Sequence, residues 1–412
     1  MSGSQDSTEA RARRRRIPDR LPANVSLWSI VKNSIGRDLS KIPMPVDFNE
    51  PLSFLQRLTE DLEYSELLDR AAETADSCEQ LCLVAAYAVS GYSTTAARTT
   101  KPFNPLLGET FEHVRPDLGW RSIAEQVSHH PPCTAHHADG REWTMFQDFT
   151  MVSKFRGKYL SVTPAGHTHV RFNNSANHYT YHKVTTTVHN LIVGTLWIDN
   201  HGETTIENHE TGDKCVLKFH PYSYLSPGKA RRVDGVVKTK TGVARFVLQG
   251  RWDQHVDAAR VTRAGRQLET ADFQRLWTVN PPLPNGERMY NFTKLAVELN
   301  EEERGVAPTD SRLRPDQRLM ERGKWPEANR AKEQLEQRQR AARQQRQQTE
   351  GLLDGVCPLN HSSLVAGTAE PKPTWFAKTP DPLTGQPHHE LVDGEYWKCK
   401  DAQDWSRCPS IF

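Results

Sequence analysis

The chain has 412 residues, of which 36% are hydrophobic, and it contains 10 Trp, 10 Tyr and 14 Phe. This is enough apolar and aromatic material for a sizeable core, which excludes a chain that is disordered throughout. The mean hydropathy is -0.70, and the longest apolar runs, 81–89 and 191–198, are far shorter than the ~20 residues that span a bilayer. We therefore expect no transmembrane helix, and the first residues contain no apolar stretch typical of a secretory signal.

The charges nearly balance, with 53 Lys and Arg against 51 Asp and Glu and a net charge of +2. This argues against a protein that coats nucleic acid over its whole surface, so any basic site must be local. The 7 Cys are odd in number and scattered, and no CxxC pair occurs. They indicate reduced thiols in the cytosol rather than a disulfide framework or a zinc ribbon.

The N-terminal part of the chain contains two segments of different character. Residues 1–23 are predicted to be a disordered basic tail whose arginines, Arg11 and Arg13 to Arg16, are solvated; a weak localisation signal or a contact with anionic membranes are the alternatives. Residues 26–35 follow a helical pattern that Gly36 ends. This short apolar helix is either docked on the core or a movable flap over an apolar ligand.

The middle of the chain changes from a helical to a strand pattern. Two or three helices are predicted within 49–99, around 52–68 and 79–97, and from Thr110 the hydrophobic period becomes two. So many strands at short spacing predict an antiparallel meander that closes or nearly closes into a barrel, because open edges favour aggregation. The predicted strands are 111–114, 143–149, 169–172, 191–198, 204–206, 215–219, 233–237 and 244–252.

The C-terminal part is predicted to be more helical. Residues 290–299 form one more strand, 327–348 form a helix, and 349–370 form a mobile loop. The tail is rich in aromatic residues and should dock onto the body. The aromatic residues in question are Trp375, Phe376, Tyr396, Trp397 and Trp405. From these patterns the fold class is mainly β with flanking helices.

A stiff loop with two hydrogen-bond donors lies at 101–109, KPFNPLLGE. Its two prolines and its glycine restrict the backbone between the last helix and the first strands. Lys101 and Asn104 are three residues apart, and an ammonium and an amide held in this way would form half of a phosphate site. An ordinary connection between helix and strand is the alternative.

A second motif, EQVSHHPP, occupies 125–132. The two prolines end the strand and hold His129 and His130 at its exit. A metal site is disfavoured because no spacing supplies a third ligand. A catalytic pair with Ser128 is disfavoured because there is no nucleophile elbow. Two imidazole N–H donors directed at an anion fit the pattern better.

The long C-terminal helix carries Lys332, Glu336 and Arg340 at i, i+4 and i+8, on one face. Such a row is usually a solvated face with internal salt bridges. Alternatively, it is a charged wall opposite the loops of Lys101 and His129. In that case Lys332 and Arg340 hold phosphate while Glu336 accepts hydrogen bonds from sugar hydroxyls.

Segments 101–109 and 125–132 together resemble the fingerprint of the oxysterol-binding protein family. The resemblance runs from about residue 25 to residue 412 and is closest to the short members, without a PH domain, of the cholesterol and phosphoinositide subgroup. It also includes 49–59, 289–293, 313–316 and the Trp-rich tail.

The resemblance implies a lipid-binding domain over 24–412, built as a large, nearly closed antiparallel β-barrel around an apolar tunnel. Its parts would be an N-terminal lid (24–46), a helical region (47–100), the barrel (101–300) and a C-terminal helical region (301–412). By analogy the tunnel holds one lipid at a time, a sterol or phosphatidylserine in exchange for phosphatidylinositol 4-phosphate. The implied head-group site consists of Lys101, Asn104, His129, His130, Lys332, Glu336 and Arg340, and the lid would contact lipid through Trp28, Val31, Leu39 and Ile42.

The expected activity is therefore the transfer of a sterol such as cholesterol against a phosphoinositide, without enzymatic chemistry, metal or cofactor other than the bound lipid. The expected partners are membrane lipids and, transiently, anionic membrane surfaces. The protein is expected to be a cytosolic monomer that associates with membranes at endoplasmic reticulum, plasma membrane or endosome contact sites. No motif for an endoplasmic reticulum receptor was found, and no nucleic acid is expected. The alternatives are a phosphatidylserine exchanger, a lipid sensor acting through partner binding, and, less favoured, a hydrolase using His129 or His130.

Overall fold

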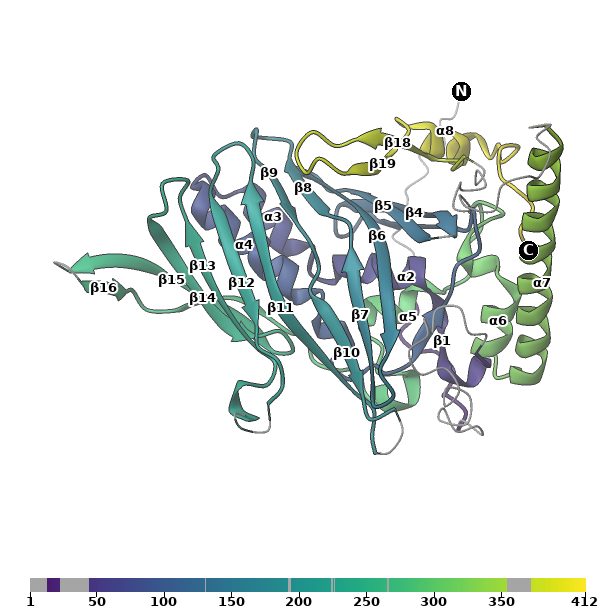
Figure 1. The fold of residues 1–412 in the computed structure, drawn as a ribbon, viewed down its shortest axis with the longest axis horizontal. Coiled ribbons are helices and arrows are strands. Elements are labelled where there is room, and N and C mark those ends of the chain that lie inside the picture. Colours follow the sequence, from purple (N-terminus) through teal and green to yellow (C-terminus); the bar gives the residue numbers. More distant parts are fainter. Residues whose placement is uncertain are drawn as a thin grey trace, which may run out of the picture.

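The computed structural model describes residues 13–22, 44–129, 131–191, 194–223, 225, 227–264, 267–353 and 372–412. A 15-stranded antiparallel sheet curls around a group of helices near the N-terminus, and further helices lie beside it (Figure 1). The predicted fold class, mainly β and nearly closed with flanking helices, is confirmed. The chain reaches this fold because sequence neighbours pair as hairpins, which need only short turns.

The sheet follows the order β16-β15-β14-β13-β12-β11-β10-β7-β6-β5-β4-β3, so most strands pair with their neighbours in sequence. The hairpin β8–β9 connects β6 to β11, and β17 pairs with β15. The strands are β3 (Thr110–Arg115), β4 (Trp120–His129), β5 (Pro132–Asp139), β6 (Trp143–Phe155), β7 (Tyr159–Ala165), β8 (Thr168–Phe172), β9 (His178–Tyr181), β10 (Thr185–His189), β11 (Trp197–Asn208), β12 (Lys214–Phe219), β13 (Arg232–Lys238), β14 (Ala244–Arg251), β15 (His255–Ala264), β16 (Gln267–Thr270) and β17 (Gln274–Thr278).

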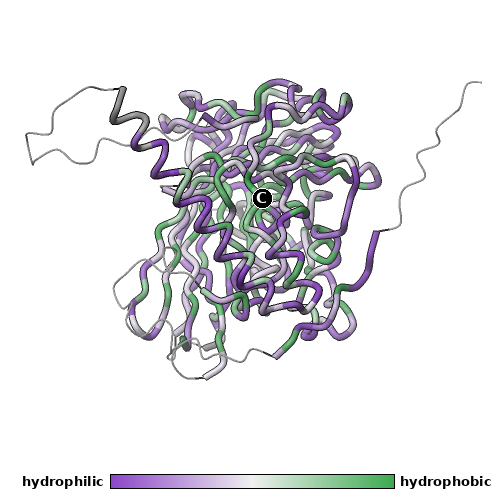
Figure 2. The backbone as a smooth tube through the Cα atoms, turned by 90° about the vertical axis from the view of Figure 1, so that its right-hand side faces the viewer, coloured by the Kyte–Doolittle hydropathy of each residue, from purple (hydrophilic) through white to green (hydrophobic). Residues whose placement is uncertain are grey.

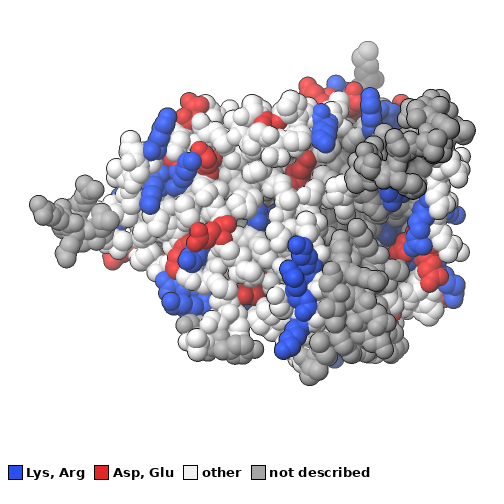
Figure 3. Space-filling model, viewed as in Figure 1, with Lys and Arg blue, Asp and Glu red and all other residues white. Residues whose placement is uncertain are grey.

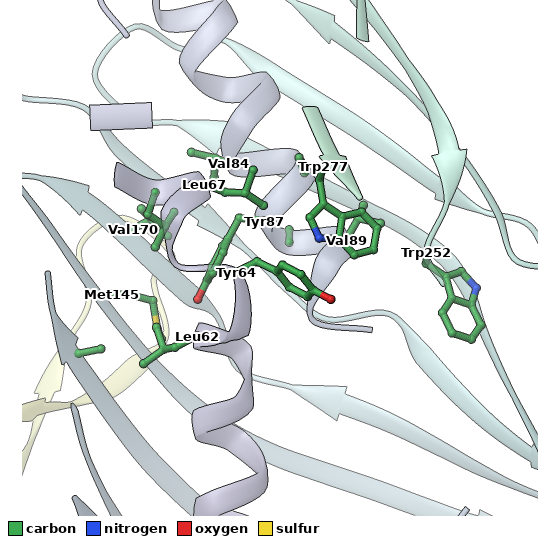
Figure 4. Close-up of a cluster of buried hydrophobic side chains, with 14 of the residues drawn as sticks. Leu62, Tyr64, Leu67, Val84, Tyr87, Val89, Met145, Val170, Trp252 and Trp277 are labelled. Carbon is green, nitrogen blue, oxygen red and sulfur yellow. The ribbon is translucent and has the colours of Figure 1, made fainter. Parts of the chain in front are cut away.

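Three helices, α2 (Phe54–Thr59), α3 (Glu66–Ala72) and α4 (Ser77–Ser90), fill part of the concave side of the sheet (Figure 1). Asp76 starts α4 by accepting hydrogen bonds from the backbone N–H groups of Cys78 and Glu79 at 2.9 and 3.1 Å. Helix α4 is buried on nearly all sides, as a helix inside a sheet must be. Tyr64, Tyr87 and Trp277 lie at the centre of this core, and the rings of Tyr64 and Trp277 meet edge to face at 5.2 Å (Figure 4).

The remaining elements cover the other side of the molecule. Helix α7 is 29 residues long and largely hydrophilic along its length (Figure 2). In the part of the chain that the structure describes, no helix is long and apolar enough to cross a membrane. These elements are β1 (Asn49–Ser53) and β2 (Lys101–Phe103), which pair in parallel, α5 (Lys294–Leu299), α6 (Pro315–Glu321), α7 (Trp325–Leu353), the hairpin β18 (Phe376–Pro380) and β19 (Pro387–Leu391), and α8 (Glu395–Ala402).

The aromatic tail docks as expected, but it is not purely helical. Trp375 and Trp397 are buried against Ile123 and Ala135 in a second apolar cluster on the outer side of the sheet. The hairpin β18–β19 forms part of this tail, which differs from the predicted helical region. The two strands read FAKTP and PHHEL, which are too short and too polar to show a clear hydrophobic period, so the sequence pattern did not reveal the hairpin.

Three further predictions are wrong in detail. Residues 290–299 contain α5 instead of a strand, because the Thr293 hydroxyl caps a helix by accepting from the backbone N–H of Ala296 at 3.1 Å. The run 191–198 joins β11 only at its end, and its residues Leu191, Leu196 and Ile198 line a cavity; 192 and 193 lie outside the described residues. The predicted loop 349–370 begins as the last turn of α7, and 354–370 lie outside the described residues.

The prediction of a disordered tail is wrong for residues 13–22, which lie along the body. Arg13 donates to the carbonyl of Val114 at 3.0 Å, and Arg14 contacts Glu321 at 2.7 Å. Ile17 is only 2% exposed. Carbonyls and carboxylates of the domain hold these arginines. The charge pattern alone indicated a solvated tail because it does not show these partners. Residues 1–12 and residue 23 lie outside the described residues.

Candidate functional site

A cavity of about 560 Å³ lies in the part of the sheet that the helices leave unfilled. Its wall consists of side chains from β6, β7 and β10 that point inward. Because successive side chains of a strand point to opposite faces, Met151 and Ser153 line the cavity, while Val152 between them is 54% exposed. The apolar lining residues are Met44, Phe48, Phe54, Pro102, Phe103, Pro105, Pro132, Phe149, Met151, Leu160, Val162, Val188, Leu191, Leu196 and Ile198. A cavity of this size and character suits a small apolar ligand.

One side of the cavity is polar and basic. Lys101 and Asn104 line it, together with Arg20, Arg57 and Arg98. The sequence pattern predicts the first two at a head-group site, but it does not predict the three arginines. They lie in segments without a charged motif, although Arg57 belongs to 49–59, which is part of the family resemblance, and only the fold brings them to the cavity.

Arg98 belongs to a buried ion network behind this polar side. Its guanidinium lies 2.6 Å from Glu50 and 2.5 Å from Glu60, and Arg57 lies 3.0 Å from Glu50. Burial disfavours the charged form of Glu50, but Arg98 and Arg57 outweigh this effect and lower the pKa of Glu50. These arginines are thus matched by carboxylates, and their main effect is to fix β1 and the chain before Lys101.

The loop 101–109 is fixed through its backbone, as its prolines predict. β2 pairs with β1, and the Asn49 amide donates to the carbonyls of Lys101 and Pro102 at 3.1 and 3.2 Å. The guanidinium of Arg314 donates to the carbonyl of Asn104 at 2.8 Å. The backbone partners hold the loop in place while the side chains of Lys101 and Asn104 line the cavity.

Glu109 completes the anchoring of this loop. Its carboxylate accepts hydrogen bonds from the backbone N–H of Leu106 at 2.9 Å, from the hydroxyl of Ser311 at 2.7 Å and from Arg314 at 2.9 Å. Burial raises the pKa of Glu109. Gly108 beside it has φ +78°, and a Cβ there would lie 3.2 Å from Pro409, so two constraints favour glycine.

The second motif forms the turn between β4 and β5. β4 ends at His129 and β5 begins at Pro132, which agrees with the predicted position of the histidines at a strand exit; His130 itself lies outside the described residues. Gln126 and Pro132 line the cavity. Thr134 donates to the Gln126 side chain at 2.7 Å, which holds this amide at the cavity wall.

Lys332, Glu336 and Arg340 on α7 pair with one another. Glu336 lies 2.6 Å from Lys332 and 3.1 Å from Arg340, the arrangement expected of a self-paired helix face. Helix α7 nevertheless borders the cavity, because Asn329 accepts a hydrogen bond from the backbone N–H of Val46 at 3.0 Å and the flanking Met44 and Phe48 line the cavity. Asn329 was not predicted.

The structure thus brings Lys101 and Asn104 together at the cavity and places His129 at the end of β4, next to the turn. The α7 residues lie on a neighbouring helix. The four predicted lid residues, Trp28, Val31, Leu39 and Ile42, lie outside the described residues. Lys, Arg, Asp and Glu are interspersed over the face seen in Figure 3, in keeping with the nearly balanced charge.

Comparison with known proteins gives the same class of protein as the motifs. The family model for oxysterol-binding protein matches residues 26–401. Oxysterol-binding protein 2 from Mus musculus is 52% identical over 97% of this chain and 44% of its own length. Oxysterol-binding protein-related protein 1B from Arabidopsis thaliana is 40% identical over 97% of this chain and 77% of its own length.

Solved structures share the fold. The crystal structure of the Osh1 ORD domain with ergosterol has a TM-score of 0.84 and 35% identity, covering 97% of this chain and 94% of that one. The Osh3 ORD from Saccharomyces cerevisiae in complex with PI(4)P has a TM-score of 0.80 and 30% identity, covering 97% and 99%. The chain therefore belongs to the oxysterol-binding protein family, as the motifs predicted, and it folds as a lipid-binding domain of that family.

Proposed function

We propose that this chain carries one lipid at a time in the cavity and exchanges a sterol, such as cholesterol, for phosphatidylinositol 4-phosphate or a related phosphoinositide between membranes. The observation that carries the proposal is a single cavity with an apolar wall on β6, β7 and β10 and a basic side at Lys101. Both lipids have an apolar body, and only the phosphoinositide has a head group that requires cations.

The bound lipids of similar structures support this pair of ligands. Osh1 ORD structures contain ergosterol or cholesterol, and the Osh3 ORD contains PI(4)P. Two ligands that occupy one cavity compete for it, so a gradient of one lipid can drive transport of the other. A sterol in water exposes on the order of a few hundred Å² of apolar surface, so at ~25 cal/mol per Å² several kcal/mol oppose unaided transfer. An apolar cavity removes most of this barrier.

For the phosphoinositide head group we propose Lys101, Asn104, His129, His130, Lys332, Glu336 and Arg340. Lys101 and Asn104 have the strongest support because they line the cavity. The α7 residues would have to exchange their mutual ion pairs for contacts with phosphate. We further propose that the protein meets anionic membrane surfaces transiently while it loads and unloads, and that the segment 24–46 covers the bound lipid.

The test is extraction from liposomes that contain sterol, phosphatidylserine and phosphatidylinositol 4-phosphate, followed by mass spectrometry of the re-isolated protein. We expect sterol or phosphoinositide, one lipid per chain, with each excluding the other. Phosphatidylserine in place of sterol would replace the proposed cargo, and a protein without lipid would contradict the carrier function. In a transfer assay, phosphatidylinositol 4-phosphate in the acceptor liposomes should accelerate sterol delivery; unchanged rates would contradict exchange and indicate a lipid sensor.

A further inference from the structure

Three side chains with metal-binding atoms meet on the outer side of the sheet, opposite the cavity. Cys133, Asp148 and His389 offer ligand atoms that all lie within 4.8 Å of one another. Cys133 is on β5, Asp148 is on β6, and His389 is on β19 of the C-terminal hairpin. In the β5–β6 register Cys133 pairs with Thr150 and Ala135 pairs with Asp148, so the first two ligands are diagonal neighbours on one face.

The hairpin is already joined to the sheet at this point. Nδ1 of His389 lies 2.8 Å from Oδ2 of Asp148, and the backbone N–H of His389 donates to both carboxylate oxygens at 3.1 and 3.2 Å. The side chains of Asp148 and His389 are each 11% exposed, and Cys133 is 7% exposed. The cluster is therefore shielded from most solvent and is held by regular strands, unlike an adventitious group of surface residues.

The ligand types indicate which cation fits. A thiolate, an imidazole and a carboxylate form a mixed set of intermediate softness, which zinc prefers and which calcium and magnesium do not. Zinc bonds of about 2.0–2.3 Å require ligand atoms within roughly 4 Å of one another, so small side-chain rotations would complete the site. Three protein ligands leave the fourth tetrahedral position for water.

We propose that Cys133, Asp148 and His389 form a zinc site that fixes the hairpin β18–β19 to the outer side of the sheet. The sequence pattern predicts no metal site here, because Asp148 and His389 are 241 positions apart and no local spacing connects them. The next residues in the chain, Thr134 and Phe149, line the lipid cavity. The zinc site thus lies directly behind the cavity wall.

The test is titration of the full chain, stripped of metal under reducing conditions, with cobalt(II) in place of zinc. Coordination by Cys133 gives a thiolate-to-cobalt charge-transfer absorption, which a site made only of histidines does not give. We expect saturation near one cobalt per chain, displacement by zinc, and loss of the band in Cys133→Ser. Cys399→Ser, which removes a partly exposed thiol on α8, should keep the band.

Two further variants keep the proposal testable if Cys133→Ser does not fold. Asp148→Asn and His389→Gln preserve the size of each side chain and should weaken cobalt binding at least ten-fold. Zinc should also raise the Tm of the native chain and leave that of His389→Gln unchanged, because a ligand that binds only the folded state stabilises it. Absence of the band in the native chain, or a band that survives in Cys133→Ser, overturns the proposal. Neither readout involves lipid, so the result is independent of the proposed exchange.

Discussion

The carboxylate of Glu125 accepts a hydrogen bond from the backbone N–H of Trp375 at 2.9 Å, and a second one from Thr374 at 2.7 Å. This contact joins the first residue of the EQVSHHPP motif to the start of the C-terminal tail. Gln126, the next residue, lines the cavity. Strand alternation therefore gives the motif two roles, with one side holding the tail and the other forming the wall of the cavity.

Replacing Glu125 by Ala should lower the free energy of unfolding by about 2–6 kcal/mol, because the buried N–H of Trp375 and the partly buried N–H of Thr374 lose their acceptor at about 1–3 kcal/mol each. Urea denaturation of the full chain measures the effect. Glu203→Ala is the matched control: this side chain is 60% exposed and lies 3.5 Å from Lys218 on the surface. The control should change stability by less than about 1 kcal/mol. Equal effects of the two substitutions would show that Glu125 does not anchor the tail.

The same carboxyl group predicts a dependence of stability on pH. Burial raises the pKa of Glu125 to about 7, above the 4.5 of an unperturbed glutamate. The folded state therefore binds this proton more tightly than the unfolded state, so the free energy of unfolding should fall as pH rises from about 4.5 to about 7 and then level off.

Glu125→Gln removes the titrating group, and its stability should lack this slope. The difference between the native chain and Glu125→Gln should change by about 1.4 kcal/mol per pH unit over this interval, or about 3 kcal/mol in total. Denaturation midpoints across the interval measure it. Parallel pH profiles for the two proteins would mean that the pKa of Glu125 is not raised.

The sequence predicted the positions of the strands better than it predicted the surroundings of their side chains. The two-residue period identified β12, β13 and β14 because buried side chains alternate with more exposed ones along each strand. The run 191–198 was misassigned because Leu191, Leu196 and Ile198 line a cavity, and apolar character alone does not reveal which surface a residue meets.

The candidate site was predicted to the extent that it is local in sequence. Lys101 and Asn104 lie on one stiff loop, so the prolines sufficed to place them together. Arg20 and Arg98 reach the same cavity from distant segments, and only tertiary contacts bring them there. Likewise, Glu109 anchors the loop through Arg314, which is about two hundred residues away in the chain. No spacing rule could have paired these two residues from the sequence.

Residues 151 and 152 provide a direct test of the cavity. Met151→Trp places a large ring inside the cavity and should reduce the binding of sterol and phosphoinositide alike by at least ten-fold, because both lipids need the same space. Val152→Trp makes a similar change one residue later, on the exposed side, and should leave binding unchanged. Lipid extraction from liposomes measures both variants. Normal extraction by a folded Met151→Trp protein would mean that lipid binds elsewhere.

Lys101 should distinguish the two lipids. Lys101→Ala removes a cation from the polar side of the cavity, and a hydrogen bond to a charged group contributes about 1.5–3 kcal/mol, so phosphoinositide extraction should fall by about ten- to a hundred-fold. Combined replacement of His129 and His130 by Ala should act in the same direction. Sterol binding should be retained in both. Lys154→Ala, which removes an exposed lysine of β6, is the control. Equal loss of sterol and phosphoinositide would refute the assignment of Lys101 to the head group.

Arg98 should matter for stability more than its position at the cavity suggests. Arg98→Met leaves Glu50 and Glu60 buried without their shared cation, and breaking a buried ion pair in this way costs about 3–5 kcal/mol. Arg245→Met is the control, since Arg245 pairs with Asp76 at the surface, where both side chains are more than one third exposed. It should cost less than about 1 kcal/mol.

The pH dependence of the Arg98→Met variant identifies the cause of its instability. In the native chain the arginines lower the pKa of Glu50, so its contribution to stability is present above the unfolded pKa and is lost as pH falls. Without Arg98, burial dominates and the carboxyl groups bind protons more tightly in the folded state. The variant should therefore regain stability relative to the native chain as pH falls toward about 4.5. A deficit that is constant with pH would instead indicate lost packing, for example against the ring of Phe292, which lies 4.6 Å from the guanidinium.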